Sequence, residues 1–121
     1  MSVLVNATEL AAMIDAGQPV RLLDVRWRLG GPPGVDAYLA GHLPGAVFVD
    51  LDVDLAARPD PAAGRHPLPD PADLQAALRR WGINDGDLVV AYDDDGNRAA
   101  ARAWWLLRWA GVDGARLLDG G

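Results

Sequence analysis

The chain has 121 residues, of which 50% are apolar and 23% are charged, enough for one globular domain with a single core. Its net charge of −6 argues against nonspecific binding of nucleic acid, which needs a basic surface. No stretch approaches the ~18 uninterrupted apolar residues of a membrane span, and the start lacks the basic segment of a signal peptide. We therefore expect a cytoplasmic protein with neither a membrane nor a nucleic-acid partner.

Two residue types are missing from the sequence. Without cysteine, the chain can form no disulfide, no thiolate metal site and no thiol nucleophile of its own. Without lysine, since all 11 basic residues are arginine, it can support no mechanism that needs an amine side chain. Two histidines without a cysteine make a poor transition-metal site, and we expect neither a metal nor a cofactor.

Short apolar strands alternate with helices along the chain. In chain order we predict strand 3–5, helix 9–16, strand 20–25, one or two helical turns in 36–43, strand 46–51, helix 71–81, strand 88–92, helix 98–110 and strand 115–119. Thr8 is the expected cap of the first helix, and Asp70 with Pro71 marks the start of the third. Residues 56–71 carry five prolines and should form a long loop. This alternation predicts a single α/β domain with a mainly parallel five-stranded sheet and helices on both faces.

An acidic loop separates the strand 88–92 from the long helix that begins near Arg98. It contains Asp93, Asp94, Asp95, Gly96 and Asn97. The end of a parallel strand that faces the start of a helix is where α/β proteins place their chemistry. The loop is therefore the first candidate for a functional site.

Three kinds of acidic site are excluded by their missing parts. An EF-hand aligned on Gly96 would place Ala91 and Arg102 where the loop needs oxygen ligands. The order Asp93, any residue, Asp95, glycine is similar to the nucleophile and general acid of haloacid-dehalogenase phosphatases. Those enzymes also need a lysine that binds phosphate, as do the receiver domains of two-component systems, and the chain has none.

The remaining interpretation treats the loop as a nest of backbone N–H groups at a helix start. Such a nest binds an anion, helped by the positive end of the helix dipole. A thiolate held there is stabilised and can carry a persulfide. The carboxylate of Asp93 also satisfies the nest, but it cannot carry a sulfane sulfur.

Six stretches together have the order typical of one family over nearly the whole chain. They are "LLDVRW" (22–27), "YLAGHLPGAVFVDLD" (38–52), "GRHPLP" (64–69), "GINDGDLVVAYDDDGN" (82–97), "AARAWWLLRWAG" (100–111) and "LLDGG" (117–121). With them, the chain resembles the N-terminal domain of a two-domain rhodanese, a thiosulfate or 3-mercaptopyruvate sulfurtransferase. In that family the N-terminal domain typically lacks the cysteine and often has aspartate in its place. The catalytic cysteine lies in a second, homologous domain.

The resemblance implies that Asp93 stands at the position of the nucleophile and that Asp93 to Arg98 form a degenerate active-site loop. Residues 1–121 would be the non-catalytic N-terminal half of a sulfurtransferase, without the last helix of that half. The parent enzyme would move sulfane sulfur from thiosulfate or 3-mercaptopyruvate to cyanide or a thiol, through a cysteine persulfide in its C-terminal catalytic domain. The alternative is an independent rhodanese-fold module that binds a protein or a small anion.

The other polar candidates carry mainly structural expectations. His42 should contact the local backbone in a turn, and His66 should also be structural. Asp24 and Arg26, at the exit of a strand, should form an ion pair that orients the following loop. Arg65, in the proline-rich loop of the family pattern, is a candidate for contact with the second domain.

The long helix is apolar nearly all round, which indicates cover on most of its sides. Trp105 and Trp109 are four residues apart and share a face, whereas Trp104 points about 100° away from Trp105. In so small a domain, part of this helix should be covered by another domain. Trp104, Trp105 and Trp109 are therefore interface candidates together with Arg65, and at least one of these tryptophans should be exposed in the isolated chain.

Overall fold

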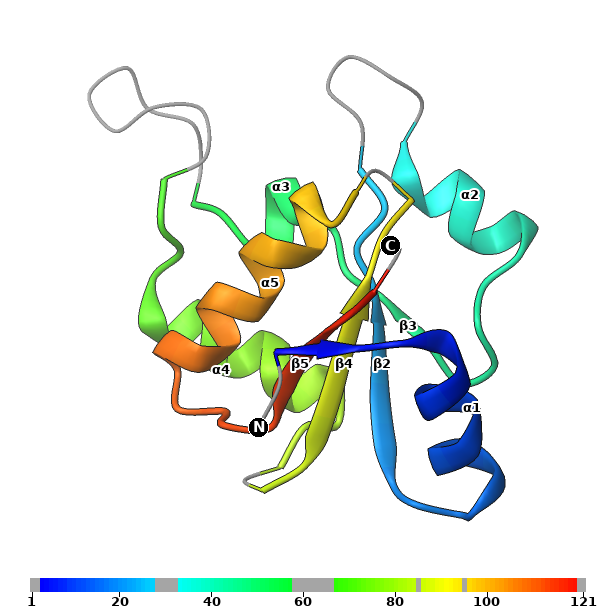
Figure 1. The fold of residues 1–121 in the computed structure, drawn as a ribbon. Helices are drawn as coiled ribbons and strands as arrows, with labels where there is room; N and C mark the ends of the chain where they lie inside the picture. The colour runs from blue at the N-terminus through cyan, green and yellow to red at the C-terminus, as the bar shows by residue number, and fades with distance from the viewer. Residues whose placement is uncertain (1–2, 28–32, 58–66, 85, 95, 120–121) are drawn as a thin grey trace.

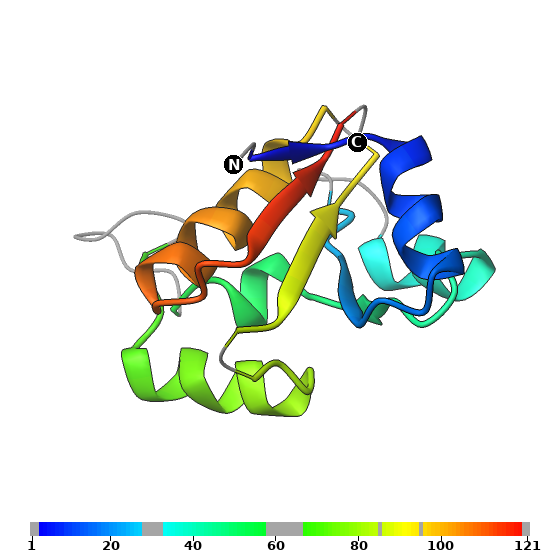
Figure 2. The same ribbon diagram turned by 60° about the horizontal axis from the view of Figure 1, so that its bottom comes forward.

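The sheet is five-stranded and fully parallel. The computed structural model describes residues 3–27, 33–57, 67–84, 86–94 and 96–119. The strands are β1 (Leu4–Val5), β2 (Val20–Asp24), β3 (Val47–Phe48), β4 (Leu88–Tyr92) and β5 (Ala115–Leu118). Their spatial order is β1-β5-β4-β2-β3, and the arrows of β4 and β5 run side by side in Figure 2. The predicted parallel sheet is confirmed.

Helices cover both faces of the sheet, as predicted (Figure 1). They are α1 (Ala7–Asp15), α2 (Gly34–Ala40), α3 (Leu51–Asp54), α4 (Pro71–Arg80) and α5 (Arg98–Trp109). α1 and α2 lie on one face, and α3, α4 and α5 on the other. Each face has its own apolar cluster: Leu106 and Val89 belong to the cluster under α5, and Leu10 and Leu22 to the smaller cluster under α1.

Two predicted helix starts have different outcomes. The cap of the first helix is Asn6, not Thr8: the Asn6 side chain accepts from the Glu9 N–H, and the Glu9 carboxylate accepts from the Asn6 N–H. The helix therefore begins at Ala7, two residues before the predicted start. Asp70 caps α4 as expected, since its side chain accepts from the backbone of the first turn.

The strand predicted over 46–51 is wrong at its end. Only Val47–Phe48 pairs with β2, and the chain then turns into the short helix α3. Asp50 causes this change, because its side chain accepts from the N–H groups of Asp52 and Val53 and so starts a helix. Much of the proline-rich stretch that follows lies outside the described residues, including Arg65 and His66.

The chain connections place a switch point between β2 and β4. β2 continues to β3 through α2 on one face of the sheet, whereas β4 continues to β5 through α5 on the other. Neighbouring strands that leave to opposite faces open a crevice at their carboxyl ends, which is where ligands bind in open α/β sheets. Asp24 and Tyr92, the last residues of these two strands, lie opposite each other in the register.

Candidate functional site

The acidic loop begins directly after β4, at the switch point. Asp93 is only 2% exposed, and its two carboxylate oxygens face the start of α5. Oδ1 accepts from the Asn97 N–H at 2.9 Å, and Oδ2 accepts from the Ala100 N–H at 2.8 Å. The side chain of Asp93 therefore occupies the N–H groups that the start of a helix would otherwise offer to an anion.

Asn97 fixes the shape of this loop. Its φ of 69° puts it in the left-handed region, where it is the sole non-glycine residue among those described. Its side-chain amide donates to the carbonyl oxygen of Leu118 at 3.0 Å, which ties the loop to the end of β5. Asparagine suits this position because it tolerates left-handed backbone and can bond the neighbouring strand.

The rest of the predicted loop is only partly placed. Asp94 and Gly96 are exposed, and Arg98 is the exposed first residue of α5. Asp95 lies outside the described residues. The structure thus brings the loop residues it describes to one edge of the sheet, with Asp93 turned inward and Asp94 outward.

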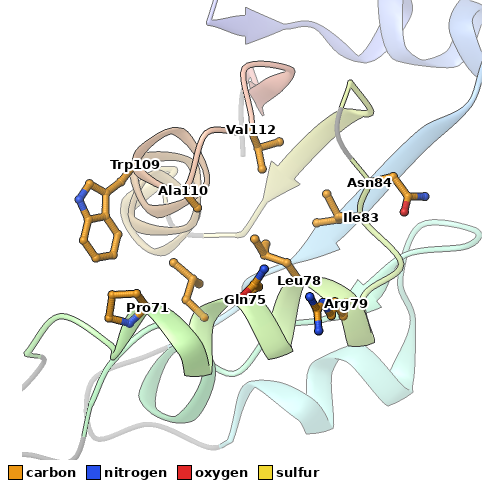
Figure 3. Close-up of a pocket in the computed structure, with 10 residues that line it drawn as sticks. Pro71, Gln75, Leu78, Arg79, Ile83, Asn84, Trp109, Ala110 and Val112 are labelled. Carbon is orange, nitrogen blue, oxygen red and sulfur yellow. The ribbon is translucent and has the colours of Figure 1, made fainter.

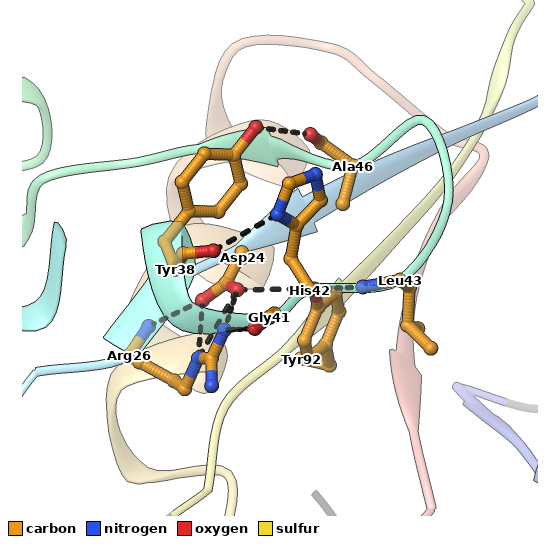
Figure 4. Close-up of polar contacts among 8 residues, drawn as sticks. All are labelled: Asp24, Arg26, Tyr38, Gly41, His42, Leu43, Ala46 and Tyr92. Carbon is orange, nitrogen blue, oxygen red and sulfur yellow. Dashed lines mark hydrogen bonds and ion pairs between the residues drawn. The ribbon is translucent and has the colours of Figure 1, made fainter. Parts of the chain in front are cut away.

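A second carboxylate, Asp24, is fully buried next to the loop, and Figure 4 shows its polar contacts. The guanidinium of Arg26 donates to both of its oxygens, the shortest contact being 2.7 Å from Nη2. This confirms the predicted ion pair. Arg26 also donates from Nη2 to the carbonyl oxygen of Gly41, so the pair holds the end of α2 against the sheet. The hydrogen bond to Asp24 raises the pKa of Arg26, and the guanidinium stays charged.

Tyr92 joins this network across the two strands. Its hydroxyl donates to Asp24 at 3.0 Å and accepts from the Leu43 N–H at 3.1 Å. Burial raises the pKa of Tyr92 to about 12, because the phenolate would lose its hydration. Sequence analysis missed this residue; its only local signal is a phenol at the end of an otherwise apolar strand.

His42 has the structural place expected of it. Its ring stacks on Tyr38 with centroids 4.0 Å apart, and its Nδ1 lies 2.9 Å from the Tyr38 carbonyl oxygen. The Tyr38 hydroxyl in turn donates to the carbonyl oxygen of Ala46 at 2.7 Å. These contacts stay within the turn from α2 to β3, so His42 is held by the local backbone.

Two shallow depressions flank the loop. One of about 370 Å³ is lined by residues that include His42, Tyr92 and Asp93, and one of about 140 Å³ by residues that include Trp27. Arg26 and Asp94 line both. No group of three or more His, Asp or Glu side chains among the described residues could hold a metal ion. The site combines a buried ion pair with an anion nest that its own carboxylate already fills.

The three tryptophans of α5 differ in exposure. Trp105 and Trp109 are each 47% exposed, and their rings stack with centroids 6.0 Å apart. Trp104 is partly buried and packs against the main core. The predicted exposure of at least one tryptophan and the shared face of Trp105 and Trp109 are confirmed.

Within the described part of the chain, no helix is long and apolar enough to cross a membrane.

The family model and the sequence relatives that match this chain indicate the same family. A family model described as "Rhodanese-like domain" matches residues 6–121. The "Putative thiosulfate sulfurtransferase SseB" of Mycobacterium tuberculosis H37Rv is 56% identical over 119 residues, which cover 98% of this chain but 42% of the relative. The "3-mercaptopyruvate sulfurtransferase" of Escherichia coli K12 is 36% identical over 97% of this chain and 41% of its own length.

Solved structures agree with the sequence relatives. The 3-mercaptopyruvate sulfurtransferase of Leishmania major superposes with a TM-score of 0.89 at 29% identity, over 99% of this chain and 33% of that one. SseA of Escherichia coli superposes with a TM-score of 0.84 at 34% identity, over 100% of this chain and 47% of that one. The chain thus spans less than half the length of these relatives.

Proposed function

The chain belongs to the rhodanese-like domain family, and from that premise we propose that it is the non-catalytic N-terminal half of a two-domain sulfurtransferase. The longer protein, called the parent protein below, would carry its catalytic cysteine in a second rhodanese domain. Support comes from the relatives, which are sulfurtransferases more than twice as long as the match. The complete absence of cysteine from this chain requires the sulfur carrier to lie elsewhere.

The observation that carries the proposal is the position of the Asp93 carboxylate. It fills the N–H nest after β4 with both oxygens bonded, at 2.9 Å and 2.8 Å. A thiolate in such a nest could accept sulfur as a persulfide, but a carboxylate cannot carry a sulfane sulfur. The domain therefore keeps the architecture of the loop and lacks its reactive group.

In the parent protein the reaction would run on the second domain. Its cysteine thiolate would attack the outer sulfur of thiosulfate, the sulfur–sulfur bond would break and sulfite would leave. With 3-mercaptopyruvate, the leaving group would be the pyruvate enolate, which takes up a proton. Attack of cyanide or a thiolate on the persulfide would then release the sulfur and restore the cysteine thiolate.

The present chain would contribute stability to the parent protein and form one wall of its active-site cleft. The Asp24–Arg26–Tyr92 network fixes the end of α2 against the carboxyl edge of the sheet, beside the acidic loop. Both depressions at that edge would then face the second domain. We propose that Trp105 and Trp109 also contact the second domain. Trp104 would contribute less to this contact, because it packs on the core.

The test is sulfur transfer by the 121-residue chain and by the parent protein, side by side. We expect turnover from thiosulfate or 3-mercaptopyruvate to cyanide with the parent protein and none above background with the chain alone. Turnover by a preparation of the chain that mass spectrometry shows to be free of any second domain would overturn the proposal. A gene that encodes no second rhodanese domain would favour the independent binding module.

A further inference from the structure

A groove separates α4 from the end of α5, on the face of the sheet away from α1 (Figure 3). Its volume is about 460 Å³, larger than either depression beside the acidic loop. Leu74, Leu78, Ile83 and Val112 form its apolar lining, and Trp109 faces Pro71 at one end. The groove is separate from the site at the switch point.

The stacked rings of Trp105 and Trp109 extend the apolar lining of the groove onto the protein surface. Trp109 lines the groove, and its ring stacks on that of Trp105 at an angle of 11°. Both rings are about half exposed, although tryptophan buries more apolar area than most side chains when it is covered. A continuous apolar surface of this kind on a small domain usually marks a contact with another segment or chain.

The polar part of the groove is one-sided in charge. Arg79, Gln75 and Asn84 line it, and none of the described residues that line it carries a carboxylate. Arg79 has no ion-pair partner among the described residues, whereas its neighbour Arg80 pairs with Asp54 at 3.0 Å. In a chain with a net charge of −6, a free guanidinium beside an apolar groove selects an occupant that carries a carboxylate.

We propose that this groove holds an amphipathic segment of the parent protein from beyond residue 121, with apolar side chains against Trp109 and a carboxylate on Arg79. The inference rests on the proposed function, because relatives that this chain matches continue for more than half their length outside the match. An amphipathic helix in a groove buries its apolar residues on one face and keeps charges at the rim. Because the segment would be tethered, its effective concentration would be high and a shallow groove would suffice.

A thiol probe can test this, since the chain has no cysteine of its own. Gln75→Cys places a thiol in the groove, and Ala76→Cys places one on the same helix in a separate depression that shares no lining residue with the groove. The rate of alkylation of each position is measured by peptide mass spectrometry, in the 121-residue chain and in the parent protein. We expect Gln75→Cys to react about tenfold more slowly in the parent, as for a groove open in about 10% of molecules, and Ala76→Cys to react equally in both.

A charge reversal tests the carboxylate. In the parent protein, Arg79→Glu should raise the alkylation rate of Gln75→Cys to that of the 121-residue chain with the same two changes, because a repelling charge replaces the guanidinium. Comparing these two rates removes the effect of the new carboxylate on the thiol one helical turn away. Arg80→Glu makes the same change one residue later, outside the groove, and should leave the slow rate unchanged.

The outcomes separate this inference from the proposed function. Equal alkylation of Gln75→Cys in chain and parent, equal slowing at both thiol positions, or no effect of Arg79→Glu would each overturn the inference. None of these results would touch the assignment of the catalytic cysteine to a second domain. A parent gene that ends at residue 121 would overturn both.

Discussion

Replacing Asp93 with asparagine tests whether the loop is built around a buried carboxylate. The change keeps the size of the side chain and removes its charge. One oxygen can still accept from the Asn97 or the Ala100 N–H, but the amide nitrogen then faces the other N–H, donor against donor. The favourable interaction of the carboxylate with the positive end of α5 is lost as well.

The expected cost follows from these two contacts. A hydrogen bond to a charged acceptor contributes about 1.5–3 kcal/mol, and at least one of the two is lost in a site that is 2% exposed. We expect Asp93→Asn to lower the free energy of unfolding by about 3 kcal/mol. Asp94→Asn, in the same loop but exposed, is the control and should change it by less than about 0.5 kcal/mol.

Urea unfolding followed by tryptophan fluorescence provides the measurement. A lower midpoint with an unchanged m-value would show a loss of native-state stability rather than a change in the unfolded state. If Asp93→Asn were as stable as Asp94→Asn, the nest would not depend on the carboxylate. The account of Asp93 as an anion in the position of a reactive group would then be wrong.

Three further changes test the network beside the loop. Arg26→Met should cost about 3 kcal/mol in unfolding free energy, because it leaves the buried Asp24 carboxylate without its guanidinium, and Asp24→Asn in the same variant should recover part of the loss. The pKa of Tyr92 is raised from 10.0 to about 12, so the phenol keeps its proton in the folded state at a pH where the unfolded chain loses it. The free energy of unfolding should therefore fall as pH rises from 10 to 12, and it should fall less in Tyr92→Phe. Gly34→Ala should destabilise by about 2 kcal/mol, because a Cβ there overlaps the carbonyl oxygen of Arg26, whereas Gly41→Ala, with open space around its Cβ, should be nearly neutral in thermal unfolding.

The sequence was sufficient for the features that depend on local chemistry. The alternation of apolar strands and helices predicted the parallel sheet, and the acidic loop after β4 predicted an anion nest filled by Asp93. The ion pair of Asp24 and Arg26 was also predictable, since the two residues are close in sequence and lie at a strand exit.

Other features depend on competing local signals or on contacts between residues far apart in the sequence. The run 46–51 is apolar except for Asp50 and so favours a strand, but the cap at Asp50 starts α3 instead. The true first cap was readable, because Asn6 and Glu9 have the spacing of a capping box. The bond from Tyr92 to Asp24 joins residues 68 positions apart and depends on β2 lying next to β4, which no local pattern encodes.

The most direct test of the central claim is to locate the transferred sulfur in the parent protein. The protein is incubated with thiosulfate, the excess donor is removed, and peptides are searched by mass spectrometry for an added sulfur atom. We expect the sulfur on a cysteine outside residues 1–121 and no added sulfur on any peptide of this chain. Sulfane sulfur on a peptide within residues 1–121 would contradict the account.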